Sequence, residues 1–256
     1  MQIFRTGLSP GLRQRKNGIW SLETAGERNT AIGVKMSLFD CFKKKSAIRQ
    51  NKIWQYPFTG NLAAIQDLCK EFSAADTLYW QSLASGWFTV YDGALRLFSV
   101  CDEPTARNVI EWNRSDNWKT TYQELLPESI WCFGEDVFGN QFCFVDDGVF
   151  WLETETGKLT RLADTFTEWK ALVDGNSSYY TGHPFASAWH DAHDTDNPLT
   201  PDKVLRPITP FVAGGKYKTA NLFPVDATET MRFGGNLANQ IKNLPDGTKI
   251  KLQFTE

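Results

Sequence analysis

The segment 131–155, WCFGEDVFGNQFCFVDDGVFWLETE, constrains the fold more than any other part of the chain. Its aromatic and aliphatic residues come in short runs that are separated by Gly134, Gly139 and Gly148. Short runs of strand-forming residues separated by glycine turns are typical of an antiparallel meander. We therefore predict a turn at 134–136, followed by strands at 141–145, 149–153 and 159–162.

The flanking sequence predicts one more hairpin and several helices. Residues 86–100 read as two strands around Asp92 and Gly93, a dipeptide that supplies the positive φ of a tight turn. Apolar residues recur at helical spacing in four segments, and Thr165 and Glu168 match a capping box at the start of the third. The four predicted helices span 62–72, 104–112, 165–173 and 227–244.

The pattern is weaker after residue 175. A helix is expected around Phe185 and Trp189, followed by a polar loop. Further on, strands are expected at 210–212, 220–225 and 248–254, with a turn at Gly214 and Gly215. Gly234 and Gly235 lie inside the last predicted helix, where each glycine costs about 1 kcal/mol relative to alanine. We expect a kink or a close backbone contact there.

Charge divides the chain into a basic arm and an acidic body. Residues 1–52 contain 11 Lys and Arg against 3 Asp and Glu, whereas residues 53–256 contain 16 against 27. The arm shows no clear periodicity, so we predict that it is disordered or weakly structured. Alternatively, the natural chain begins at Met36. An acidic body disfavours nucleic-acid binding and attracts basic partners.

Composition also limits the location and the cysteine chemistry. No apolar run approaches the ~18–20 residues of a membrane-spanning helix, and the N-terminus lacks the apolar core of a secretory signal. We therefore expect a cytoplasmic protein that does not bind membranes. Five scattered cysteines without a C-x-x-C pair favour free thiols over disulfides or a thiolate zinc site. They are Cys41, Cys69, Cys101, Cys132 and Cys143. Cys132 and Cys143 lie on neighbouring predicted strands and can approach each other.

The three histidines, His183, His190 and His193, are the most suggestive metal-ligand set. Imidazoles three residues apart on a helix can share a face, and zinc or nickel would accept them. The set lacks the Glu of H-E-x-x-H, so we favour a solvated helix end with no metal. The chain also contains no phosphate-binding loop, nucleophile elbow or dinucleotide-binding glycine motif. We therefore expect no cofactor and no catalytic residues.

Paired acids in the meander are the candidate partner-binding residues. Glu135 and Asp136 fall in one predicted turn, and Asp146 and Asp147 fall in another. In a catalytic pair of carboxylates, at least one must be desolvated enough to raise its pKa. Asp is also common in exposed turns, because its side chain can hydrogen-bond to the nearby backbone. We therefore interpret these acids as docking groups for a basic partner. With the acids at the neighbouring turn and strand end, the set comprises Glu135, Asp136, Asp146, Asp147, Glu153 and Glu155.

Taken together, these segments resemble the Smi1/Knr4 family, which is also called the SUKH superfamily. The resemblance extends from about residue 57 to the C-terminus, and the run FGEDVFGNQFCF at 133–144 is its most specific part. It is also carried by YDGALRLF at 91–98, EWN at 111–113, ETG at 155–157, EW at 168–169 and the segment 210–250.

The resemblance implies an α+β fold with a central, curved, mainly antiparallel sheet flanked by helices. It places one Smi1/Knr4-like domain at 53–256, with a C-terminal strand-helix-strand extension. The family carries no conserved catalytic constellation. Many bacterial members are immunity proteins that bind polymorphic toxins, often nucleases, whereas fungal members act as regulatory scaffolds. We therefore expect a non-enzymatic protein that binds a protein partner, with immunity as the first hypothesis and scaffolding as the alternative.

Overall fold

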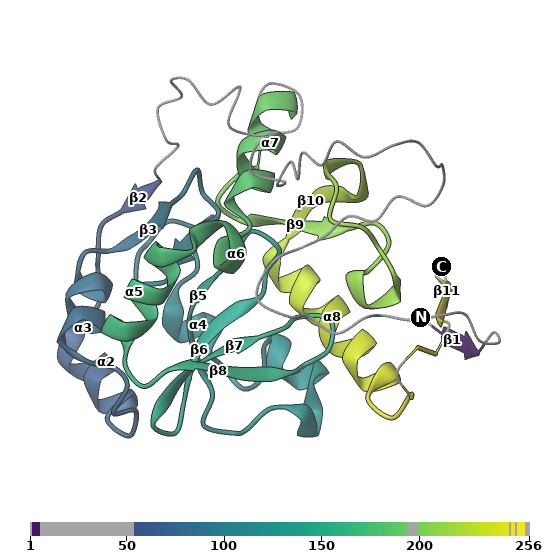
Figure 1. Cartoon of the computed structure of the whole chain (residues 1–256). Helices are drawn as coiled ribbons and strands as arrows, with labels where there is room; N and C mark the ends of the chain where they lie inside the picture. Colours follow the sequence, from purple (N-terminus) through teal and green to yellow (C-terminus); the bar gives the residue numbers. More distant parts are fainter. Residues whose placement is uncertain (1, 6–53, 194–198, 246, 249, 254–256) are drawn as a thin grey trace. The chain divides into compact units, whose positions relative to one another are not determined.

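The structure is a computed structural model that describes residues 2–5, 54–193, 199–245, 247–248 and 250–253. Seven strands form one sheet in which each strand pairs with its sequence neighbour, and every pair is antiparallel (Figure 1). In sheet order, the strands are β2 (Gln55–Tyr56), β3 (Trp87–Val90), β4 (Leu95–Leu97), β5 (Trp131–Glu135), β6 (Gln141–Val145), β7 (Gly148–Leu152) and β8 (Leu159–Ala163).

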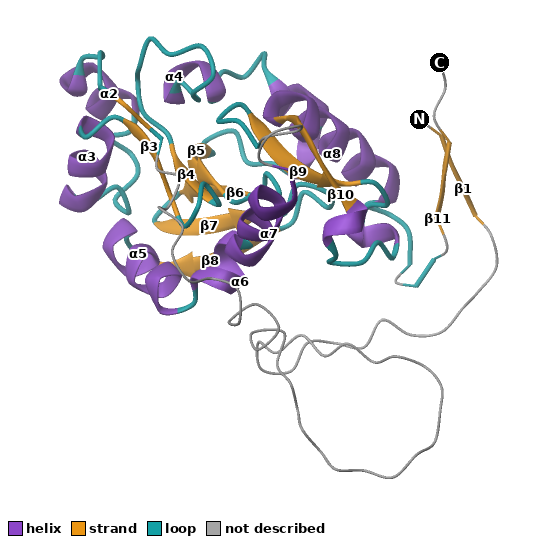
Figure 2. Ribbon diagram, turned by 90° about the horizontal axis from the view of Figure 1, so that it is seen from above, coloured by secondary structure: helices purple, strands orange, loops and turns teal. Residues whose placement is uncertain are grey.

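Helices flank this sheet, with α5 on one side and α4 on the other (Figure 2). The fold is therefore α+β, as predicted. The α-helices are α2 (Leu62–Leu68), α3 (Thr77–Ala84), α4 (Val109–Trp112), α5 (Phe166–Gly175), α6 (Ser177–Thr181), α7 (His183–His193) and α8 (Ala227–Ile241). The short 3-10 helices are η1 (Trp118–Thr121), η2 (Gln123–Leu125), η3 (Phe211–Ala213) and η4 (Thr219–Asn221).

The predicted meander forms the centre of the core. Phe142 and Phe144 alternate with Cys143 along β6, and all three side chains are buried. Because successive strand residues face opposite sides, the two phenylalanines lie on the side of α5, where the Phe142 and Trp169 ring centroids are 5.0 Å apart. Cys143 lies on the other side, with its Sγ 3.0 Å from that of Cys132. The expected approach of these two free cysteines is confirmed.

Two irregularities interrupt the ladder of this sheet. The register shifts between Cys132 and Gly134 in β5, and again between Val149 and Phe150 in β7. Bulges of this kind bend a strand and increase its twist. One of them lies in the β5–β6 pair at the middle of the sheet, and the other lies in the β7–β8 pair at its edge.

The hairpin between β3 and β4 turns where the sequence predicts it. Asp92 and Gly93 have φ values of 55° and 82°, and Tyr91 joins them with a φ of 55°. Left-handed backbone is rare for a residue as bulky as tyrosine. The turn therefore fixes the Tyr91 backbone in an unusual conformation.

The C-terminal segment adds a two-stranded ribbon and a long helix. Strand β9 (Lys203–Pro207) pairs with β10 (Leu222–Asp226), and α8 follows directly. The predicted strand at 210–212 is wrong because this segment forms η3, whose first N–H groups donate to the Glu155 carboxylate. Strand β9 itself was not predicted. A second apolar cluster, which includes Val137, Trp189 and Leu205, joins the ribbon to α7 and the turn after β5.

The expected close approach at Gly234 and Gly235 is confirmed. A Cβ on Gly234 would lie 2.4 Å from the Thr154 carbonyl oxygen, and one on Gly235 would lie 2.4 Å from Thr121 Oγ1. Helix α8 therefore packs with its backbone against the end of β7 and against η1.

Four residues of the predicted arm are described. Residues Gln2–Arg5 form β1, which pairs antiparallel with β11 (Ile250–Gln253). The rest of the arm up to residue 53, including Met36 and Cys41, lies outside the described residues. Among the helices that the structure describes, none has the length and apolar character needed to cross a membrane.

Candidate functional site

The prediction that Glu135 is an exposed turn carboxylate is wrong. It is the last residue of β5, and its side chain is 0% exposed. Its Oε1 lies 2.7 Å from Arg107 Nη2 and 3.4 Å from Arg96 Nη1. A carboxylate can stay charged inside a protein when nearby cations and hydrogen bonds offset the free-energy cost of removing it from water. Glu135 therefore holds two arginines in place and does not itself meet a partner.

The sheet register assembles this ion cluster. Glu135 pairs with Arg96 on β4 and with Gln141 on β6. Gln141 donates from Nε2 to Glu135 Oε2 at 3.4 Å and accepts from Trp112 Nε1 at 2.9 Å. Burial lowers the pKa of Arg96 to about 10, so that this guanidinium remains charged at neutral pH. The network fixes the position of Arg107, which lies in the loop before α4.

Asp136 is also buried, at 2% exposure, which corrects its predicted exposure. Its Oδ1 accepts hydrogen bonds from the backbone N–H groups of Phe138 and Asn140, and its Oδ2 accepts one from the Asn140 side chain. Burial raises the pKa of Asp136 to about 7, against the opposing effect of these hydrogen bonds. Asp136 is thus a structural residue of the β5–β6 turn.

An acidic pocket of about 350 Å³ adjoins the ion cluster. Arg107 and Trp112, both buried members of the network, also line the pocket. Its other walls come from the 101–106 loop, from α4 and from the segments next to β9 and α8. Five carboxylates line it, namely Asp102, Glu103, Glu111, Asp202 and Asp226. We call this feature the acidic pocket.

Arg107 is held rigidly beneath these carboxylates. Its Nη1 donates to the Pro201 carbonyl at 2.9 Å, and its Cζ lies 5.6 Å from the centroid of the Trp112 ring. The side chain is 6% exposed, and its Nε has no hydrogen-bond partner among the described residues. A buried donor without a partner is uncommon in folded proteins. Because Glu135 neutralises much of the Arg107 charge, the surrounding carboxylates make the pocket negative overall.

The pocket carboxylates differ in how they are engaged. Glu103 accepts from the N–H and hydroxyl of Thr105, and Asp226 caps α8 by accepting from Glu229 N. Glu111 is 63% exposed and pairs with the exposed Arg114. Asp202 makes no side-chain hydrogen bond or ion pair within the part of the chain that the structure describes. Among these four, Asp202 is the least engaged, and Glu111 is held only by an exposed ion pair of the kind that contributes little.

The remaining predicted acids do not share one surface. Asp146 and Asp147 are exposed at the β6–β7 turn, where Asp147 pairs with Arg161 at 2.9 Å. Glu153 accepts from the Thr156 hydroxyl. Glu155 is partly buried and caps η3 by accepting from Phe211 N and Val212 N. Burial raises the pKa of Glu155 to about 7.

The five pocket carboxylates were not predicted from the sequence. They come from three segments that the fold brings together across more than 120 positions of the chain. The local clues, such as Asp102 and Glu103 before Pro104, are also typical of ordinary turns. In the sequence, only the excess of acidic residues in 53–256 indicated a negatively charged surface.

The three histidines lie along α7, from its first residue to its last, and the expectation of a solvated helix end is wrong for His190. His190 is 4% exposed, and its Nε2 lies 3.2 Å from the Asp92 carbonyl. The His193 ring is 4.3 Å from that of Trp189. No group of three His, Cys, Asp or Glu side chains suited to hold a metal ion occurs among the described residues.

Comparisons with known proteins give matches among solved structures alone. No protein-family model matches the chain, and no curated protein matches its sequence. The crystal structure of Atu4351 from Agrobacterium tumefaciens matches with a TM-score of 0.48 and 12% sequence identity. This match covers 72% of this chain and 86% of that one. The proposals below rest on the geometry described above and on the family resemblance of the sequence.

Proposed function

We propose that this chain is a non-enzymatic binding protein that receives a basic segment of a protein partner in its acidic pocket. The observation that carries the proposal is the pocket itself, with five carboxylates arranged around one rigidly held guanidinium. Carboxylates of this kind steer a basic partner toward the site and fix its orientation.

A basic peptide segment matches the charge of the pocket. Its Lys or Arg side chains can pair with Asp202 and Glu111. Cys101 also lines the pocket, but burial raises the pKa of its thiol. It therefore stays protonated at neutral pH and is a poor nucleophile. These features favour binding over catalysis.

An immunity protein is the form of this function that the Smi1/Knr4 resemblance implies. A toxin that cuts nucleic acid has a basic cleft, which an acidic surface can occupy. A cytoplasmic regulatory scaffold of the same family is the alternative. Both require a protein partner, and they differ in whether binding protects a cell.

Co-production with a candidate toxin encoded by a neighbouring gene tests the immunity proposal. Cells that produce the toxin should survive when they also produce this chain. Asp202→Lys with Glu111→Lys should weaken binding by about 100-fold or more, because each close charge pair contributes about 1.5 kcal/mol or more. Asp67→Lys with Glu128→Lys makes the same change in charge at exposed positions outside the pocket. This control should protect as the unmodified chain does.

The outcomes separate the hypotheses. Equal loss of protection in both double variants would assign the effect to overall charge and contradict a role for the pocket. Binding of a partner that is not toxic would favour the scaffold. Charge reversal at Asp146 and Asp147 tests the β6–β7 turn, and loss of binding only there would move the interface to that turn.

A further inference from the structure

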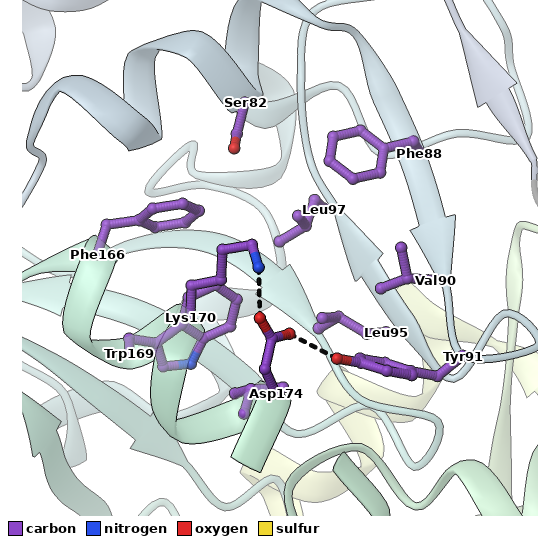
Figure 3. Close-up of a pocket in the computed structure, with 11 residues that line it drawn as sticks. Ser82, Phe88, Val90, Tyr91, Leu95, Leu97, Phe166, Trp169, Lys170 and Asp174 are labelled. Atoms are coloured by element: carbon purple, nitrogen blue, oxygen red, sulfur yellow. Dashed lines mark hydrogen bonds and ion pairs between the residues drawn. The ribbon is translucent and has the colours of Figure 1, made fainter. Parts of the chain in front are cut away.

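A second cavity, of about 300 Å³, lies between α3, the β3–β4 hairpin and α5 (Figure 3). Its walls are mainly apolar and include Phe88, Leu97, Phe166, Trp169 and Val173. Phe166, Trp169 and Val173 are each 1% exposed and belong to the main core. The cavity therefore reaches into the fold and is more than a shallow surface groove.

Polar side chains bridge the edge of this cavity. Tyr91 Oη donates to Asp174 Oδ1 at 2.6 Å, and Lys170 pairs with the other oxygen of the same carboxylate (Figure 3). Lys170 and Asp174 are 51% and 47% exposed. The bridge joins the strained hairpin turn to α5. A side chain fixed on a folded partner would have to break it to enter, whereas a small molecule can pass during brief openings.

One hydroxyl offers a polar anchor inside the cavity. Ser82, on α3, points its hydroxyl toward the centre of the cavity (Figure 3). Among the described residues, this hydroxyl has no hydrogen-bond partner. Because a serine hydroxyl can both donate and accept, it can bind a hydroxyl or a carbonyl group.

We propose that this cavity binds a small, largely apolar molecule with one hydroxyl or carbonyl group that hydrogen-bonds to Ser82. A closed apolar cavity of ~150 Å³ stays dry and holds one benzene. A cavity of about 300 Å³ therefore suits a ligand of roughly twice that size, such as a two-ring aromatic compound. Apolar walls with a few placed polar groups are the usual composition of such sites. The proposal does not depend on the acidic pocket.

Naphthol and naphthalene are matched probes, because they share two rings and differ by one hydroxyl. Calorimetric titration of the full chain should show that both bind and that naphthol binds more tightly. Ser82→Ala should reduce the affinity for naphthol to that for naphthalene and leave naphthalene unchanged. Alanine is a better helix former than serine, so this variant should fold.

A variant in which a larger side chain fills the cavity provides the second test. Val90 lines the cavity, and Val90→Phe should weaken the binding of both probes by about tenfold or more, without a fall in melting temperature, because filling a cavity is commonly stabilising. Val212→Phe makes the same change at a partly buried position outside the cavity and should leave both affinities unchanged. Failure of both probes to bind would overturn the proposal, as would equal affinities in the unmodified chain and the Val90→Phe variant. Equal binding of naphthol before and after Ser82→Ala would overturn the role of Ser82.

Discussion

Glu135 is a carboxylate that the sequence suggests is exposed and that the structure buries. The sequence places it between Gly134 and Asp136, which is a plausible turn. The structure extends β5 through it and gives it two arginine partners. Neither arginine is near it in sequence, since Arg96 and Arg107 precede it by 39 and 28 positions. Local reasoning could not have found this cluster.

Replacement of Glu135 tests the ion cluster. Glu135→Gln removes the charge that compensates two buried guanidinium groups, so we expect a loss of about 3–5 kcal/mol in the free energy of unfolding. Urea denaturation measures this loss. The exposed ion pair of Asp147 provides the control, because surface pairs contribute little. If Glu135→Gln were as harmless as Asp147→Asn, the cluster would have no structural role.

Glu155 and Asp136 make stability depend on pH. Burial raises the pKa of each carboxyl to about 7 in the folded chain, whereas both lie near 4 in an unfolded chain. The folded state thus binds more protons between these values, and the free energy of unfolding should fall as the pH rises from about 4 to about 7. Above pH 7, their contribution should level off.

Urea denaturation at pH 5, 6, 7 and 8 measures this dependence. One pKa unit corresponds to about 1.4 kcal/mol, so Glu155 should account for a decrease on the order of 2 to 3 kcal/mol. Glu155→Gln should flatten the profile by that amount. A stability that rises over this interval in the unmodified chain, with the same profile in Glu155→Gln, would contradict the effect of burial.

Local signals predicted some elements but not others: α3, which Asp76 caps, was missed, and the helix expected at 104–112 begins only at Val109. Helix α5 begins after Thr165, whose hydroxyl accepts from Glu168 N, and the strands of the meander follow their glycine turns. In contrast, η3 forms where a strand was expected because a carboxylate 56 positions earlier caps it. Strand β9 needs β10 as its partner, and its own sequence carries little alternation.

At Gly234 in α8, packing and helix propensity should have opposite effects on the stability of an alanine variant. Gly234→Ala would gain up to about 1 kcal/mol from propensity, but its new Cβ would lie 2.4 Å from the Thr154 carbonyl. We expect a net loss of about 1–3 kcal/mol from overpacking. Gly175→Ala, where no atom lies within 4 Å of the added Cβ, should instead be neutral or stabilising. Thermal melts of both variants decide between the two effects, and a stabilising Gly234→Ala would show that α8 can move away.

In the whole molecule, acidic residues are in excess along most of the chain, and the fold brings five of them together in the acidic pocket. The sequence indicated the sign of the charge but placed it at the meander turns. The acidic pocket arises instead where the 101–112 segment meets the residues before β9 and α8. Positions so far apart in sequence come together only through the C-terminal ribbon, whose β9 strand was not predicted. The acidic pocket therefore could not be located before the fold was known.

Association with the partner should depend strongly on salt. Charge steering weakens when the screening length falls from about 10 Å at 0.1 M to about 3 Å at 1 M ionic strength. We expect the association rate constant to fall by about tenfold or more over this range, with a smaller change in the dissociation rate constant. Surface plasmon resonance at several salt concentrations measures both. An association rate that is insensitive to salt would exclude steering by the pocket.

Hydrogen–deuterium exchange of the chain, alone and in its complex, tests the location of the partner most directly. If the basic segment occupies the acidic pocket, exchange should slow in residues 101–112 and 200–206, and the β6–β7 turn at Asp146 and Asp147 should be unchanged. Slower exchange at that turn, with no change around Arg107 and Asp202, would contradict the proposed site.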